Sequence, residues 1–467
     1  MDKAEQVAIA QWETFFNQSG DREQLVARYL FEHLFAAHLH FSDVTGSQFY
    51  ELVRSTTGPG ERVNPLRTVR PNDDPGQAFY YRLQPLRQVI VEKNHITYAL
   101  DDARLELYQT LFFQPQWQVE ALPGYRYEDR ANPFLTFAAI PASARYQFLL
   151  DNAEFFVRNF IRGPVCRGQI ATDVIRDQFW VVFEDPEQEA YVNDADYRAK
   201  VSPLLGLPGL KSDLLSMGSE WLEYKAQRND YLKLRREHYS ARKPKGATLD
   251  ELWDGDGSNQ DALLTIFRHH DSASVMRGLQ GRIPRTAWVM DYPLLERTYY
   301  ELVTNFNVFG SVSHQGQTRL YFDLIRNGAE QNMLRFIPPA SREALYAHWY
   351  QGGAKLKHEI TYVDPDLSTP VAMPYAEASD NTAVMARFSE LLMQHTAQVS
   401  GPADTLNRCP SGDCPRPNIS DAQQQLESLL QPLARADGAS LPVIPLLPEV
   451  TFLRVTEGEQ RWVYTLL

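Results

Sequence analysis

Cys166 has the surroundings that best suit reactive chemistry. It stands in Arg162-Gly-Pro-Val-Cys166-Arg167-Gly-Gln, between two expected helices, and Arg158 precedes Arg162 by four residues on one helical face. Nearby guanidinium groups lower the pKa of a thiol and can hold a phosphate oxygen through two hydrogen bonds. The alternative is a buried small apolar side chain, the commoner role of a lone cysteine. Cys166 is therefore a candidate catalytic residue, and the three arginines are candidate phosphate ligands.

The other two cysteines, Cys409 and Cys414, lie in Cys-Pro-Ser-Gly-Asp-Cys. Pro and Gly favour a tight reversal of the chain that brings the two sulfurs together, so we favour a disulfide, which fits an oxidising compartment. The alternative is a metal pair. It would need further ligands, and the nearest histidine in the sequence, His395, is outside the usual ligand spacings.

The histidines offer a weaker signal. His314 lies in Gly-Ser-Val-Ser-His-Gln-Gly, an expected exposed loop or helix start where a catalytic or ligating imidazole is accessible. His33 and His40 are expected on one face of a helix, but about 10 Å apart along its axis, too far to share a metal ion directly. His38 is expected to point elsewhere. The competing interpretation is that these three are polar members of a mostly buried helix.

Several motifs for cofactor and metal chemistry are missing. The sequence contains no phosphate-binding glycine loop, dinucleotide fingerprint, Gly-x-Ser-x-Gly elbow or His-Glu-x-x-His. The segment starting at Asp254 resembles a calcium loop, but Asn259 replaces its glycine and Thr265 its final glutamate. We therefore predict neither a nucleotide site nor a metal site.

Charge is distributed unevenly along the chain. The formal net charge is −13, which disfavours nonspecific binding to nucleic acid and also to anionic lipid. Residues 225–245 are the exception, with eight Lys or Arg against two acids, a local net of +6. Lys233, Arg235 and Arg236 lie in a helix whose start is apolar, so this segment could lie on a phospholipid surface. The alternative is a solvated helix between domains, with cations that complement its C-terminal dipole.

These residues must be positioned by alternating helices and strands. Two antiparallel helices are expected before residue 41, then strands near 49–54, 78–83, 89–93 and 95–100, helices at 103–113 and 142–162, and a strand at 178–183. Later strands are expected at 262–269, 274–279 and 286–290, helices near 292–306, 315–328, 341–350 and 420–431, and a closing hairpin from 450 to 467.

This pattern predicts an α+β protein with two mixed domains, residues 1–185 and 251–467, joined by a helical, basic amphipathic segment at 186–250. No stretch approaches the roughly 18 uninterrupted apolar residues of a membrane-spanning helix, and residues 1–20 have no basic region or cleavage site of an export signal.

Six ordered segments resemble the fatty acid cis/trans isomerase family, over about residues 10 to 350. They are Ala-Arg-Tyr-Leu-Phe-Glu-His33-Leu-Phe-Ala-Ala-His38-Leu, Arg70-Pro-Asn-Asp-Asp-Pro-Gly, Asn132-Pro-Phe-Leu-Thr-Phe, Phe160-Ile-Arg-Gly-Pro-Val-Cys166-Arg-Gly-Gln, Arg268-His-His-Asp-Ser-Ala-Ser and Trp288-Val-Met-Asp-Tyr-Pro-Leu-Leu-Glu296-Arg.

The resemblance implies a periplasmic enzyme with haem c that converts cis unsaturated acyl chains of membrane phospholipids to trans, without net redox change, in the response to membrane stress. It would act peripherally on the inner membrane. In the family the haem is attached through Cys-x-x-Cys-His near the amino terminus, and this sequence has no such motif. The expected partners are therefore phospholipid acyl chains and a haem-bearing N-terminal portion, with His33 and His38 as weak candidates for an axial ligand.

The chemistry explains why a cofactor is expected. Rotation about a carbon–carbon double bond requires its π overlap to be broken transiently, which an electrophilic haem iron could achieve and acid-base side chains do poorly. Reversible addition of a Cys166 thiyl radical is a speculative substitute. The alternative function, from another class, is a noncatalytic lipid-binding or partner-binding protein that retains the scaffold.

Overall fold

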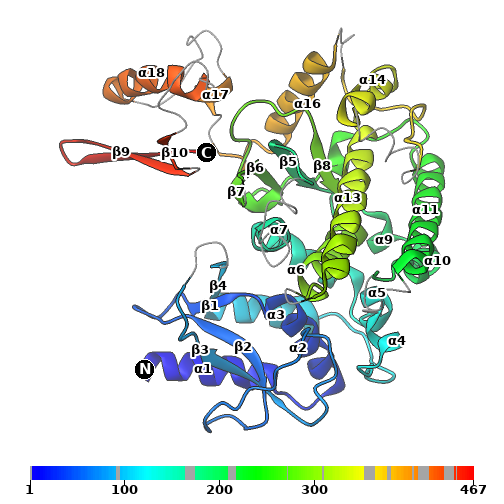
Figure 1. Ribbon diagram of the computed structural model, residues 1–467, viewed down its shortest axis with the longest axis vertical. Coiled ribbons are helices and arrows are strands. Elements are labelled where there is room, and N and C mark those ends of the chain that lie inside the picture. Colours follow the sequence, from blue (N-terminus) through cyan, green and yellow to red (C-terminus); the bar gives the residue numbers. More distant parts are fainter. Residues whose placement is uncertain are drawn as a thin grey trace.

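The computed structural model of the protein describes most of the 467 residues. It covers residues 3–467 except for 91–94, 163–173, 209–216, 271, 308–309, 352–362, 376–379, 402–403, 409–419, 436–445 and 449. Its helices and mixed sheets confirm the predicted α+β class. The N-terminal elements form one end of the molecule, and α11 (Met217–Arg242) and α13 (Val312–Leu334) run along one side (Figure 1).

The first sheet has the strand order β3-β2-β1-β4, with β1 (His38–Phe41), β2 (Tyr50–Ser55), β3 (Tyr80–Pro85) and β4 (Thr97–Leu100). Strands β1 and β4 are parallel and the other neighbours antiparallel. Helices α1 (Lys3–Phe16), α2 (Asp21–Leu34) and α3 (Asp102–Phe113) complete this end of the chain. The apolar positions of α1 and α2 are buried in one core with the strands, as their helical spacing predicts.

Two local predictions for this region are wrong. The second helix ends at Leu34, and His38 and His40 belong to strand β1, not to that helix. The predicted strand near 89–93 is not formed at residues 89 and 90, and 91–94 lie outside the described residues. The pairing of His38 with Thr97 on β4 explains the first difference, because only the fold brings that partner strand alongside.

The second sheet has the order β7-β6-β5-β8, with β5 (Gln178–Phe183), β6 (Leu263–Arg268), β7 (Ala273–Arg277) and β8 (Ala287–Met290). Strand β5 is buried on both faces: Phe179, Val181 and Phe183 join one apolar cluster, and Trp180 and Val182 join another. The sheet takes strands from both sides of residue 185, while the division into domains stays a prediction.

Further helices complete the fold, and some of them carry site residues described below. In chain order they are α4 (Tyr127–Arg130), α5 (Pro133–Thr136), α6 (Ala142–Leu150), α7 (Ala153–Arg162), α9 (Ala190–Asn193), α10 (Ala195–Val201), α12 (Tyr292–Tyr299), α14 (Pro339–Trp349) and α16 (Asn381–His395). Helix α13 packs against β8 and α7 against β7. Directly after α12 comes one π-helical turn, η6 (Tyr300–Thr304).

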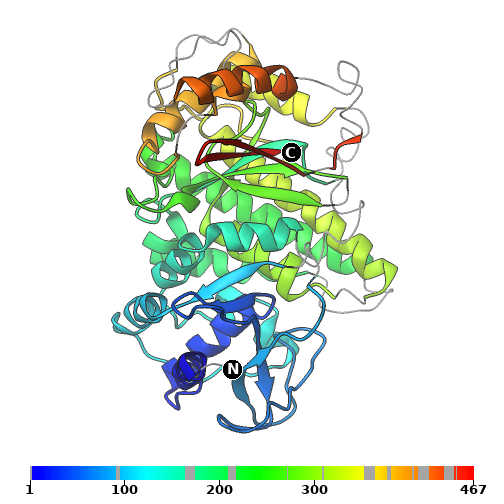
Figure 2. The same ribbon diagram turned by 90° about the vertical axis from the view of Figure 1, so that its left-hand side faces the viewer.

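The C-terminal region consists of α17 (Thr405–Arg408), α18 (Asp421–Arg435) and the hairpin of β9 (Thr451–Glu457) and β10 (Gln460–Leu466). The hairpin forms a two-stranded sheet of its own and is seen edge-on above the N-terminal end in Figure 2. None of the helices in the described ranges combines the length and the apolar character that crossing a bilayer requires.

Candidate functional site

A cleft of about 610 Å³ lies at the N-terminal end of the molecule. Its walls come from the turn between α1 and α2, the segment that enters β3, and the loop before α4. Aromatic and apolar side chains dominate this lining, which we call the aromatic cleft: Phe16, Leu25, Pro75, Phe79, Tyr80, Tyr81, Leu122, Pro123 and Tyr125. Its volume falls within the roughly 300–1,000 Å³ typical of small-molecule sites.

Local structure positions this lining. Gln24 and Leu25 each lie about one turn before Arg28 on α2, so the three side chains line the same wall. Phe79, which is half-buried, packs edge-to-face on Tyr81 with ring centroids 5.1 Å apart, which fixes the aromatic run before β3. Two of the segments with family resemblance reach this cleft, through Arg28 in one and Asp74 with Pro75 in the other.

Arg28 is the cation of the aromatic cleft. It is 5% exposed, its Nε donates to Glu32 at 2.9 Å, and one of its terminal nitrogens donates to the carbonyl oxygens of Pro123 and Gly124. The guanidinium lies 4.1 Å from the centre of the Tyr125 ring. Burial opposes the charge, but the Glu32 carboxylate and then Tyr125 outweigh it, so the pKa of Arg28 is raised. Arg28 thus stays protonated.

Further along α2, the next turns join α12 in a fully buried polar junction. Tyr29 donates to a Glu296 carboxylate oxygen at 3.0 Å, and His33 Nε2 lies 3.5 Å from the other oxygen of that carboxylate. His33 also contacts the carbonyl oxygen of Tyr29 through Nδ1 at 2.7 Å and stacks on Tyr299. At η6, Tyr300 donates to Glu32 at 2.9 Å. The π turn therefore contacts the same helix that lines the aromatic cleft, and π turns are frequent at functional sites.

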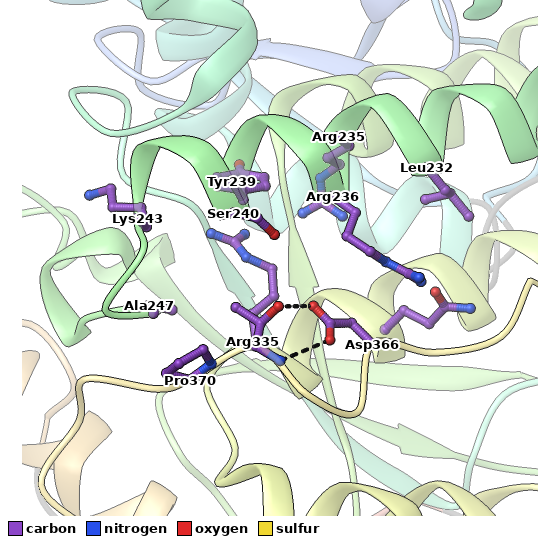
Figure 3. Close-up of a pocket in the computed structure, with 13 residues that line it drawn as sticks. Leu232, Arg235, Arg236, Tyr239, Ser240, Lys243, Ala247, Arg335, Asp366 and Pro370 are labelled. Atoms are coloured by element: carbon purple, nitrogen blue, oxygen red, sulfur yellow. Dashed lines mark hydrogen bonds between the residues drawn. The ribbon is translucent and has the colours of Figure 1, made fainter.

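A second, smaller pocket of about 60 Å³ lies between the C-terminal half of α11, the end of α13 and the segment 366–370. We call it the cationic pocket, because Arg235, Arg236, Lys243 and Arg335 line it with a single carboxylate, Asp366 (Figure 3).

Glu184 compensates two of these cations from beneath the pocket. Its carboxylate pairs with Arg235 at 3.0 Å, pairs with Arg335, and accepts a hydrogen bond from Tyr239 at 2.5 Å. Burial would raise the pKa of Glu184, but the two arginine charges outweigh it, and the pKa is lowered. Asp291 adds a second carboxylate, 2.8 Å from Arg235.

The predicted phosphate and lipid ligands are dispersed in the structure. Arg158 pairs with Glu154 on α7, and Arg162 is half-buried at the end of that helix. Lys233 is exposed. Cys166 and Arg167, together with the predicted disulfide partners Cys409 and Cys414, lie outside the described residues.

One residue of the expected lipid surface points inward. Arg235 is 6% exposed and holds Glu184 and Asp291, so it is not available to a bilayer. The apolar side of α11 is likewise covered, since Tyr231 and Leu232 are buried in the protein core. Among the described side chains of this helix, the exposed ones are mostly polar, Lys233 among them, and Leu222 near its start is 61% exposed. Half-buried Arg236 lines the cationic pocket.

The described histidines do not fit a covalently attached haem. None of the 467 residues forms Cys-x-x-Cys-His. His33 is 0% exposed and enclosed by Tyr29, Glu296 and Tyr299, which leaves no open coordination position. His38 is also buried, and its Nδ1 lies 2.7 Å from the Nδ1 of His95. In the described ranges, no three His, Cys, Asp or Glu side chains gather as a metal site would require.

His314 begins α13, as predicted, but it is half-buried and not openly accessible. Its Nε2 accepts a hydrogen bond from the backbone N–H of Asn307 at 3.0 Å, and its ring stacks on Phe306. Burial, with a smaller contribution from the charge of Arg70, lowers the pKa of His314 to about 4. The imidazole is therefore neutral near pH 7.

Sequence reasoning missed the aromatic cleft. The only local signal was the run Phe79-Tyr80-Tyr81, which was interpreted as a strand and not as the wall of a cavity. The facing walls come from α2 and the loop at 122–125, whose proximity depends on tertiary packing. Aromatic runs at the entry to a strand, close to a Pro-rich turn such as 71–75, would be the pattern to look for.

Comparison with known proteins gives one result that covers the complete chain. A family model described as fatty acid cis/trans isomerase matches residues 1–467. No curated protein and no solved structure shows significant similarity to the chain. The family resemblance expected over about residues 10 to 350 is thus confirmed and extends over the whole sequence. The chain belongs to the fatty acid cis/trans isomerase family.

Proposed function

We propose that this chain binds a cis-unsaturated acyl chain in the aromatic cleft and takes part in its conversion to the trans isomer. The observation that carries this proposal is the cleft itself, about 610 Å³ in volume and lined mainly by aromatic and apolar side chains. The natural source of such chains is membrane phospholipid, and the expected compartment is the periplasm.

The lining suits a hydrocarbon chain. Each methylene buried there contributes about 0.8 kcal/mol, so a few methylenes suffice for measurable binding. Phe16, Phe79 and Tyr81 supply flat, rigid walls, and Arg28 places one cation beside them. We infer that the arginine orients the polar end of the lipid, while the aromatic walls hold the hydrocarbon and exclude water.

The proposed role of these residues is binding and orientation. The cleft contains an arginine, an aspartate, amides and phenols, and none of these groups breaks the π overlap of an isolated double bond. In the family a haem c supplies that chemistry, and this sequence lacks its attachment motif. We therefore propose that the haem is held by residues outside these 467, in a haem-bearing portion or a partner.

The missing attachment motif also favours a second candidate function, in which the scaffold binds lipid without catalysis. Both functions require the aromatic cleft to hold an acyl chain. They differ in whether the double bond changes its geometry.

Leu122→Asp tests the aromatic cleft. Leu122 lines it and is 40% exposed, so the substitution introduces a carboxylate without removing a core side chain. We expect oleate to bind the wild type and to bind the variant at least about tenfold more weakly, in line with the 1.5–3 kcal/mol of a buried leucine-sized contact. Leu135→Asp is the matched control, since Leu135 is 53% exposed on α5 and does not line the cleft.

Titration calorimetry with oleate measures this effect. Equal affinity of the wild type and Leu122→Asp, or no binding by the wild type, would contradict the proposal. Gas chromatography of the fatty acids, with the haem-bearing portion supplied, distinguishes the two functions. If the wild type forms trans product and Leu122→Asp forms less, the isomerase function is supported. If the wild type binds oleate but forms no trans product, the noncatalytic alternative is supported.

A further inference from the structure

The cationic pocket has a closed and well-defined wall. Arg236 and Ser240 lie four residues apart on one side of α11, and Lys243 follows directly after the end of that helix. The opposite wall is the segment 366–370, which is held against the chain after α11. Gly246 makes this possible: its φ is +90°, and a Cβ there would lie 1.9 Å from the carbonyl oxygen of Pro370.

The side chains of the pocket differ in how their charges are compensated. Beneath it, Glu184 and Asp291 neutralise Arg235. Glu184 and Glu251 neutralise Arg335. At its rim, Arg236 donates to the backbone carbonyl oxygen of Asp364 at 2.6 Å, a partner without charge. Arg236 at the rim is therefore less compensated by negative charge than Arg235 and Arg335 beneath the pocket.

Lys243 adds to this rim, while Arg342 does not line the pocket but contacts Asp366, which does. The ammonium group of Lys243 donates to Gln188 at 2.9 Å and lies 3.6 Å from Glu251. Arg342, 0% exposed, reaches the outer side of Asp366 at 3.8 Å, and one of its terminal nitrogens is buried without a hydrogen-bond partner. Burial, with a smaller contribution from the Arg335 charge, lowers the pKa of Arg342 to about 10. Asp366 is thus shared between Arg342 and the pocket, so its one carboxylate does not neutralise the cations of the rim by itself.

Size restricts the ligand. A cavity of about 60 Å³ has room for about four to six water-sized groups, given roughly 10–15 Å³ for each. A tetrahedral oxyanion, with four oxygens around one centre, has this size. An acyl chain or a nucleotide base does not fit.

We propose that the cationic pocket binds a phosphate group, with Arg236 and Lys243 as its direct ligands at the rim and Arg335 stacked on Tyr239 behind them. The guanidinium of Arg335 lies 3.5 Å from the centre of the Tyr239 ring, which holds that cation in place. The phosphate comes either from a soluble phosphate group or from a lipid headgroup. The site shares no residue with the aromatic cleft, so this inference does not depend on the proposed function.

The test is a titration with sodium phosphate at constant ionic strength, followed by calorimetry. We expect saturable binding by the wild type, and at least about tenfold weaker binding by Arg236→Gln/Lys243→Gln, since charge-assisted hydrogen bonds are the strong contacts to phosphate. Lys233→Gln/Lys245→Gln is the matched control. It removes the same charge from two exposed residues that do not line the pocket, and it should bind like the wild type.

Ser240→Asp is a second variant that removes no existing ion pair. Ser240 is exposed and lines the pocket, so a carboxylate there repels phosphate while circular dichroism reports an unchanged fold. Equal loss of binding in the control and the pocket variants, unaltered binding in Ser240→Asp, or no binding by the wild type would each overturn the proposal.

Sedimentation with phosphatidylglycerol vesicles distinguishes the two sources of phosphate. If Ser240→Asp weakens both vesicle binding and phosphate binding, the pocket takes a lipid headgroup. If it weakens only phosphate binding, the pocket takes a soluble phosphate group. Oleate binding in the aromatic cleft should be the same in Ser240→Asp and in the wild type, so failure of one site is not mistaken for failure of the other.

Discussion

His314 shows how the position of one residue sets its chemistry. Its ring is held between the backbone N–H of Asn307 and the ring of Phe306, and its acceptor nitrogen is already used. Protonation of that nitrogen would break the hydrogen bond from Asn307 and place a charge near Arg70. A histidine in this setting stabilises the loop after η6 as a neutral acceptor, and it is poorly suited to serve as a general acid near pH 7.

The lowered pKa of His314 predicts a pH dependence of stability. Its pKa is about 4 in the folded protein and 6.5 ordinarily, so between these values the unfolded chain binds a proton that the folded chain does not. The free energy of unfolding therefore rises with pH from about 4 to about 6.5, and is reduced as the pH falls through this window. Because the ring is only partly buried, we expect roughly 1–2 kcal/mol, well below the full conversion of the shift.

His314→Gln isolates this contribution, since glutamine can accept the same hydrogen bond but does not titrate. Urea unfolding at several pH values should show a wild-type-minus-variant difference that grows with pH from about 4 to about 6.5. A difference that is constant over this range would contradict the assignment. Titration of the ring C–H resonances by NMR gives the pKa directly.

At the scale of elements, Glu184 connects three parts of the fold. It directly follows β5 and binds Arg235 on α11 and Arg335 at the end of α13. Tyr146, on α6, donates to its backbone carbonyl oxygen at 2.5 Å. Loss of this carboxylate would therefore loosen the contact of the sheet with two long helices at once.

Glu184→Gln should lower the free energy of unfolding by about 2–4 kcal/mol. The amide places N–H donors against groups that now donate to the carboxylate, and it leaves two buried guanidinium groups less compensated. Asp291 and Glu251 remain as partners of these arginines, which limits the loss. Chemical denaturation measures the change. Glu187→Gln, at an exposed position three residues further along the chain, should stay within about 0.5 kcal/mol of the wild type. Equal effects of the two substitutions would argue against the network.

Much of the element order could be predicted from the sequence, because alternation and helical spacing are local signals. Strand β5 was predicted with its observed bounds, and the strands and helices from β6 to α14 were predicted to within a few residues, except that α13 extends six residues beyond its predicted end. Strand β1 was not predicted, because four residues shortly after a helix are too few to show the alternation of a strand. Helix α16 was missed as well.

The candidate sites could be predicted only in part, for a physical reason. Charge counting indicated Arg236, which lines the cationic pocket, but it could not show that Arg235 is neutralised by Glu184, 51 residues away. Likewise, Arg335 had no local signal. Buried ion pairs and cavity walls depend on contacts between distant segments, which composition and spacing do not record.

At the scale of the whole molecule, one apolar cluster connects the two four-stranded sheets. It runs from Trp12 on α1 through Phe156 on α7 to Val399 after α16, and it includes residues of β2 and β5. Polar contacts follow the same path, because Tyr29 and Glu32 on α2 bind Glu296 and Tyr300. The parts that share this cluster should therefore unfold together.

The C-terminal hairpin lies outside both apolar clusters, which predicts a lower local stability. The described side chains of β9 and β10 are exposed or half-buried and none is buried, with Phe452 at 69% and Val463 at 60%. A two-stranded sheet by itself is marginally stable in water. We expect the amides of β9 and β10 to exchange with deuterium at least about 100-fold faster than those of β5 and β6, which are covered on both faces.

Hydrogen exchange followed by mass spectrometry compares the two sheets in one sample, so the β5–β6 pair is its own control. Pro448→Ala, before the hairpin, should leave the exchange of β5 unchanged, because the hairpin contributes no strand to that sheet. If the amides of β9 and β10 were as protected from exchange as those of β5, contacts that the described residues do not show would have to cover the hairpin. The separation of the hairpin from the common core would then be wrong.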